Sequence, residues 1–182
     1  MPLKITIPEI ELYDDEKNEF YFVKEQKLSL EHSLVSISKW ESKWCKPFLS
    51  SEKTNEEFID YIRCMTLTQN VDPMVYKAIP FSVMKSIYEY IEAPMTATTV
   101  SNSQKHSVNN QIITSELVYC WMTLLNIPFE CQKWHFNRLI MLITVCSEEN
   151  KPKKKMSKSQ INSMYSSTNA KRRAAAAARR HK

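Results

Sequence analysis

Two residues of this sequence have the spacing of a metal-binding pair. Cys131 and His135 stand four residues apart, so on a helix they would share one face. A structural zinc site needs two further ligands, and the sequence offers no second pair at comparable spacing. We therefore interpret both as core residues, and the sequence predicts no metal or other cofactor.

Two short segments have the spacing of a nucleophilic serine and its lysine base. Ser36 precedes Lys39, and Ser82 precedes Lys85, by three residues each. The Ser-Asp-Asn and Lys-Thr-Gly segments that accompany this pair in acyl-transfer enzymes are missing. Glycine is absent from the whole sequence, which excludes the P-loop, the dinucleotide fingerprint and the nucleophile elbow. The sequence therefore predicts a protein that is not an enzyme.

The charge of the chain is divided sharply along its length. Residues 151–182 hold eleven lysines and arginines and no acidic residue. Residues 1–150 hold the other fourteen basic residues and all twenty acidic ones, a net charge of −6. This division predicts an acidic folded body, 1–150, and a basic C-terminal arm, 151–182.

The basic arm is the strongest candidate for a binding segment. Its charge suits nucleic acid, through the phosphates, or an acidic or amphipathic protein segment, and a solubilising tail is the plain alternative. Tyr165 is its single aromatic residue, which gives little capacity for base stacking, and no large apolar face suits a membrane. The candidate contact residues are Lys153, Lys154, Lys155, Lys171, Arg172, Arg173, Arg179 and Arg180.

Apolar periodicity predicts the α+β class, mainly α. Alternation in the first 30 residues predicts a small antiparallel β element, with acidic residues at 14–16 in its turn. From about 33 to 148 the spacing becomes helical, and Thr54 with Glu57 has the pattern of a capping box. One helix is expected from near Pro128 to Ile143. The arm is expected to be helical or disordered.

Two tryptophans in the first expected helix are candidates for partner binding. Trp40 and Trp44 are one turn apart, so they share a face of the helix over about 33–44. Packing in the core is the ordinary interpretation of such a pair. An aromatic docking patch is the alternative, because Lys39 and Lys43 stand beside the two rings.

Cysteine usage and hydropathy predict a cytosolic protein. The five cysteines are widely spread and form no CxxC pair, which is typical of core-filling residues in a reducing compartment. The first residues lack the pattern of a signal peptide, and no apolar run approaches the roughly 20 residues that a bilayer requires. No membrane contact is expected.

Several segments together resemble tail assembly chaperones of long-tailed bacteriophages. The resemblance covers most of the chain after Ser29, and the Lys153–Ser157 segment before the Arg/Ala-rich end fits the same pattern. The segments that carry it are SISKWESKW (36–44), YIEAPMTATT (90–99), ITSELVYCW (113–121) and NIPFECQKWHFNRL (126–139).

The resemblance implies a non-catalytic protein that binds and solubilises the tape measure protein while the tail tube assembles. It implies tail-tube subunits and a frameshifted longer form of the chain as further partners. It also implies a place in the host cytoplasm of an infected bacterium and absence from the mature virion. Two alternatives stay open: a nucleic-acid-binding protein that uses the basic arm, and a connector or tail-completion component of the virion.

Overall fold

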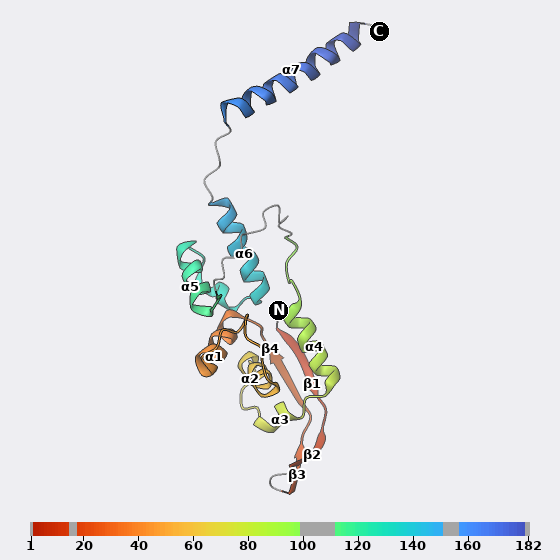
Figure 1. Ribbon diagram of the computed structural model, residues 1–182. Coiled ribbons are helices and arrows are strands. Elements are labelled where there is room, and N and C mark those ends of the chain that lie inside the picture. The colour runs from red at the N-terminus through yellow and green to blue at the C-terminus, as the bar shows by residue number, and fades with distance from the viewer. Residues whose placement is uncertain (1, 15–17, 99–111, 151–156, 181–182) are drawn as a thin grey trace. The chain divides into compact units, whose positions relative to one another are not determined.

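The computed structural model describes residues 2–14, 18–98, 112–150 and 157–180, with side chains for all of these except Asp14 and 174–180. The chain divides into two units, Met1–Glu149 and Asn150–Lys182. Unit 1 holds two small antiparallel sheets followed by helices, and the described part of unit 2 forms a helix (Figure 1). The predicted mainly α, α+β class is confirmed.

Four strands form one long, interrupted hairpin at the start of unit 1. Strand β1 (Leu3–Ile7) pairs with β4 (Gln26–Leu30), and β2 (Ile10–Asp14) pairs with β3 (Glu19–Val23), both antiparallel. The register of the first ladder, which ends at Ile7↔Gln26, continues without a shift into Ile10↔Val23. Pro8 lies between β1 and β2, where it has no N–H to donate to a ladder. The hairpin therefore has an inner half, β1–β4, and an outer half, β2–β3.

Helices follow the hairpin through the rest of unit 1. The predicted capping box forms between Thr54 and Glu57, and Asp72 caps a helix that begins at Pro73. The helices are α1 (Leu34–Trp44), α2 (Asn55–Met65), α3 (Pro73–Lys77), α4 (Phe81–Glu92), α5 (Ser115–Leu124), the 3-10 helix η1 (Phe129–Lys133) and α6 (Phe136–Glu149).

The expected helix from Pro128 to Ile143 is wrong in one respect, since it is divided into η1 and α6. Trp134 and His135 separate the two elements in an extended conformation. Here the chain pairs with the end of the hairpin: Ser33 and His135 form a β-bridge, and the Phe136 N–H donates to the His32 carbonyl oxygen at 2.9 Å. A contact about 100 residues away in sequence thus overrides the local helical periodicity.

Other residues take the left-handed conformations that glycine usually adopts. Asn18, Asn70 and Asn126 have φ of 57°, 56° and 53°. Cys45 ends α1 at φ 51°, and its N–H donates to the Glu41 carbonyl oxygen. Asparagine is the non-glycine residue that tolerates this region best, so it supplies turns in a chain without glycine.

The core of unit 1 lies between the inner half of the hairpin and the helices. Ile5, Ile7, Leu28 and Leu30 face it from β1 and β4, with α4 against β1. The other fully buried large side chains come from the helices: Leu34, Ile37, Trp40, Tyr61, Ile62, Met65, Ile87, Met122 and Leu139.

Unit 2 contains helix α7, which spans Lys158–Arg180. A capping box starts it: the Gln160 N–H donates to Ser157 Oγ at 3.2 Å, and the Ser157 N–H donates to Gln160 Oε1 at 3.1 Å. The run of alanines at 174–178 gives its C-terminal half a high helix propensity.

Candidate partner-binding surfaces

Trp40 lies in the core, as the ordinary interpretation of the tryptophan pair predicts, and not in an exposed docking patch. Its side chain is 0% exposed, and its ring lies edge-on to Phe48 with the centroids 5.3 Å apart. The indole N–H donates to the Glu57 carbonyl oxygen on α2 at 2.8 Å. A ring enclosed in this way has no surface to offer a partner, so the docking role expected for Trp40 is corrected.

Trp44 is half-buried and also joins α1 to α2. Its indole N–H donates to Asp60 Oδ2 at 2.9 Å, while the Lys43 ammonium bonds Asp60 Oδ1 at 2.5 Å. The Lys43 ammonium also lies 5.5 Å from the centroid of the Trp44 ring. The lysine beside the ring therefore takes part in a contact within the fold, and the polar end of Trp44 is occupied by α2.

The predicted contact residues of the basic arm divide into three groups. Lys171, Arg172 and Arg173 lie on α7 with exposed side chains. Arg179 and Arg180 belong to the same helix, but their side chains lie outside the described part of the structure. Lys153, Lys154 and Lys155 lie outside the described residues.

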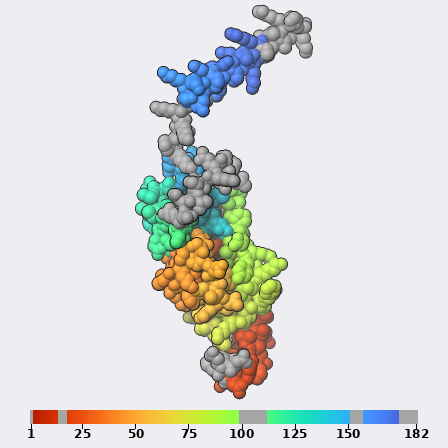
Figure 2. Space-filling view, in the orientation of Figure 1, coloured from red at the N-terminus to blue at the C-terminus, as the bar shows by residue number. Residues whose placement is uncertain are grey.

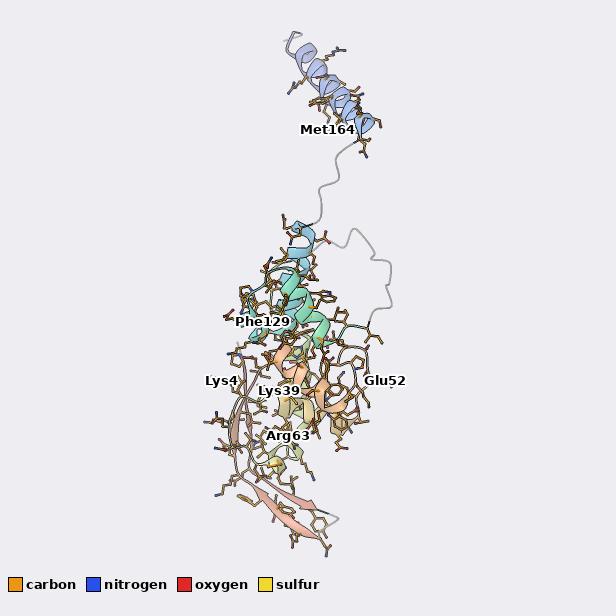
Figure 3. All side chains as sticks on the ribbon, turned by 90° about the vertical axis from the view of Figure 1, so that its left-hand side faces the viewer. Lys4, Lys39, Glu52, Arg63, Phe129 and Met164 are labelled. Atoms are coloured by element: carbon orange, nitrogen blue, oxygen red, sulfur yellow. The ribbon has the colours of Figure 1, made fainter. Side chains whose placement is uncertain are left out.

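Helix α7 also carries a short apolar stripe. Ile161, Met164 and Tyr165 follow the i, i+3, i+4 spacing, so they share one face of the helix. They are 38%, 58% and 65% exposed, and every described side chain of the helix from Lys158 to Arg173 is exposed. Figure 3 marks the place of Met164 on the helix. The helix thus presents an apolar stripe and cations together.

The outer half of the hairpin presents a surface that the sequence does not identify. Tyr13, Phe20 and Phe22 are 47%, 68% and 61% exposed, and the rings of Tyr13 and Phe20 lie 4.8 Å apart between centroids. In Figures 1 and 3 the strands β2 and β3 extend past the helices, and in Figure 2 their atoms form a narrow end of unit 1. The alternation in the sequence identifies the strands but not which face the helices cover.

The body also has a recess of about 320 Å³ between α2, α4, α6 and the segment before α2. Phe58 and Tyr88 stack on one side of it, with ring centroids 4.4 Å apart. The Lys53 ammonium donates to the Phe48 carbonyl oxygen at 2.5 Å and lies 4.1 Å from the centroid of the Phe48 ring. His32 and Phe136 line the recess as well. Its walls come from distant segments, which sequence spacing cannot bring together.

Comparison with known proteins gives these surfaces no precedent. No protein family, curated protein or solved structure matches this chain. Among the described residues, no helix is long and apolar enough to cross a membrane. The same part of the chain holds no group of three or more His, Cys, Asp and Glu side chains that could bind a metal ion.

His135, the predicted core histidine, is packed against a second one, His32. The ring centroids are 5.0 Å apart, and both side chains are buried. His32 Nδ1 lies 2.5 Å from the Tyr61 hydroxyl oxygen, and His135 Nε2 lies 2.9 Å from the Tyr90 carbonyl oxygen. Burial, and next the nearby His135, lowers the pKa of His32 to about 3, and burial also lowers the pKa of His135.

We expect this histidine pair to make stability depend on pH between 6.5 and 5. In this range the unfolded chain takes up protons on histidine, near its ordinary pKa, while His32 in the fold stays neutral. The stabilisation that comes from keeping His32 neutral is therefore fully present above pH 6.5, and it is lost as the pH falls toward 3. The unfolding equilibrium constant should rise by up to about tenfold for each pH unit from His32, and His135 acts in the same direction.

Urea unfolding at pH 7, 6 and 5 measures this dependence. Glu57 and Glu116 have lowered pKa values, so their ionised forms stabilise the fold. This stabilisation is lost only as the pH falls through and below the usual carboxyl range, so the histidines dominate the change between pH 7 and 5. A histidine NMR titration provides the direct check, because the ring signals of His32 should not move between pH 7 and 5. An unchanged urea midpoint together with titration of His32 near pH 6.5 would contradict the expectation.

Proposed function

We propose that this protein is a non-catalytic tail assembly chaperone, which binds the tape measure protein and keeps it soluble while the tail tube forms. The observation that carries the proposal is the exposed apolar stripe of α7, which lies within a strongly cationic helix. Ile161, Met164 and Tyr165 are exposed on this helix, so covering them with the apolar surface of a partner is favourable. The sequence resemblance described above supplies the partner's identity.

The division of charge supports a reversible contact. A tape measure protein presents long amphipathic helical surface, which aggregates if it is left bare. Each copy of the chain would cover a stretch of it, through the arm and a surface of the body, and two modest contacts give avidity without permanent binding. Tail-tube subunits could then displace the chaperone, which would remain in the bacterial cytoplasm and be absent from the finished particle.

The test is co-expression with the tape measure protein of the same genome. We expect the tape measure protein to be soluble and to co-purify with the full chain. Deletion of 151–182 should weaken its binding by about tenfold or more, as expected when one of two linked contacts is removed. The midpoint of thermal unfolding should stay unchanged, because the core residues all belong to unit 1. A tape measure protein that stays insoluble with the full chain would refute the function.

A matched pair of variants separates the two chemical features of α7. Replacing Ile161, Met164 and Tyr165 by serine removes the apolar stripe and keeps the positive charge. Replacing Lys171, Arg172 and Arg173 by glutamine removes three positive charges and keeps the stripe. We expect the serine variant to lose affinity for the tape measure protein in both low and moderate salt. Loss in the glutamine variant alone would indicate a purely electrostatic contact.

Binding of nucleic acid is a second candidate function, favoured by eleven cations in 151–182 without an acidic residue. Neutralisation of phosphates would make affinity fall steeply with salt, with a slope of about −0.9 per phosphate contact on duplex DNA. The acidic body, with its net charge of −6, opposes this function because it would be repelled by phosphates. Absence of DNA binding at low salt would exclude this function, and an affinity that does not fall with salt would exclude the basic arm as the phosphate contact.

A further inference from the structure

The two faces of the β2–β3 hairpin differ in composition and in exposure. Residues that are directly opposite each other on paired strands share a face of the hairpin. Tyr13 is opposite Phe20, and Glu11 is opposite Phe22, so these four residues lie on one side. Leu12 and Val23 lie on the other side, where they pack against the core. The outward side, called here the aromatic face, is defined by Glu11, Tyr13, Phe20 and Phe22.

The aromatic face is apolar where soluble proteins usually place polar residues on an outward strand face. The Tyr13 hydroxyl donates to Asn18 Oδ1, so the polar end of this ring already has a partner within the hairpin. The three aromatic residues, Tyr13, Phe20 and Phe22, remain 47%, 68% and 61% exposed. Removing such surface from water is favourable, so the face suits docking of an apolar partner.

Charge determines which partner fits. Residues 10–23 contain five acidic residues and one lysine, and Glu11 belongs to the aromatic face itself. Two copies that met through this hairpin would bring like charges together, so a second copy of the same face is disfavoured. A partner with lysine or arginine around an apolar stripe gains both burial and charge complementarity.

The shape of the hairpin favours a helix. Two strands lie about 4.8 Å apart, and a helix with its side chains is about 10 Å wide, so one helix covers both strands. Residues at i, i+3 and i+4 form a stripe on such a helix, which can rest on the aromatic rings. A basic residue at the border of the stripe would then lie next to Glu11, the acidic residue of this face.

We propose that the aromatic face of the β2–β3 hairpin docks a cationic amphipathic helix of a partner protein. That this helix belongs to the tape measure protein rests on the proposed function, whereas the chemistry of the contact does not. The hairpin would be the body's contact with the partner, separate from the contact made by α7.

The experiment uses the full chain and two synthetic helical peptides of about 20 residues, long enough to form a helix. Both peptides carry a leucine stripe; lysines flank it in one, and glutamates replace every lysine in its twin. The double variant Phe20→Thr/Phe22→Thr removes two rings and keeps residues that suit a strand. The matched control is Phe81→Thr, which removes an 86% exposed ring from α4.

We expect the lysine peptide to bind the double variant about tenfold or more weakly than it binds the wild type, as measured by fluorescence anisotropy. Phe81→Thr should bind it as the wild type does. The glutamate peptide is attracted by the cations of 151–182, so its affinity should be the same for all three proteins. Circular dichroism should show the same folded content in each.

Three outcomes would overturn the proposal. One is equal affinity of the lysine peptide for the wild type and the double variant. Another is an equal loss of affinity in Phe81→Thr, which would show that any exposed ring contributes. The third is wild-type self-association in light scattering that disappears in the double variant, which would identify a second copy as the occupant. An insoluble tape measure protein beside a positive peptide result would refute the function and leave the hairpin contact intact.

Discussion

Replacement of Trp40 by alanine is expected to lower the free energy of unfolding by about 3–5 kcal/mol. The side chain is fully buried, it packs edge-on against Phe48, and its N–H donates to the Glu57 carbonyl oxygen. Removing the indole leaves a cavity between α1 and α2 and an acceptor without its donor. Because a domain of this size is stabilised by only about 5–15 kcal/mol, the variant should lose a large share of its stability.

Urea unfolding, followed by tryptophan fluorescence and circular dichroism, measures this loss. Trp40→Phe should cost less, because a phenyl ring still fills most of the space of the indole, although the hydrogen bond to Glu57 is lost. Phe129→Ala is the surface control, since that ring is 55% exposed and its removal should change stability little. A small loss of stability in Trp40→Ala, joined to a large loss of binding to the tape measure protein, would restore Trp40 as a docking residue.

The elements of this fold could be predicted from the sequence where local signals agree. The capping box at Thr54–Glu57 forms as predicted, and β2 and β3 pair on either side of the predicted turn, whose residues 15–17 lie outside the described part of the structure. The break between η1 and α6 could not be predicted, because the bridge from Ser33 to His135 joins segments far apart in the chain. Apolar periodicity describes one segment and contains no information about its distant neighbours.

The candidate surfaces divide in the same way. The basic arm is visible in the composition of 151–182, because charge needs no tertiary contact to be recognised. The aromatic face is not, since Phe20 and Phe22 would look the same on the inward side of a strand. For Trp40 and Trp44 the sequence leaves core and docking patch open: the fold encloses Trp40 in the core, whereas Trp44 is half-buried and its docking role stays a prediction. The exposed fraction of an aromatic side chain distinguishes a core residue from an interface residue, and this fraction is known only from the tertiary structure.

Replacement of Glu41 by alanine is expected to lower the free energy of unfolding by about 2–6 kcal/mol. Glu41 lies on α1 with 7% exposure, and its two carboxylate oxygens accept from two separate parts of the body. The Phe48 N–H donates to Oε1 and the Ser115 N–H donates to Oε2, each at 2.7 Å. Ser115 is the first residue of α5, and Thr114 makes no side-chain cap bond. Glu41 therefore caps α5 from 74 residues away.

The capping role distinguishes Glu41 from an ordinary surface carboxylate. Alanine leaves two N–H groups without their acceptor and removes a negative charge from the positive end of α5. Glu41→Gln keeps one good acceptor but turns an amide N–H₂ toward the second donor, so its loss should be intermediate. Glu56→Gln, at an exposed position in the first turn of α2, is the matched control and should cost less than about 1 kcal/mol.

Hydrogen exchange locates the effect: the amides of Phe48 and Ser115 should lose protection in both Glu41 variants and keep it in Glu56→Gln. Equal stability of Glu41→Ala and Glu56→Gln would mean that the carboxylate does not join α1 to α5 in solution.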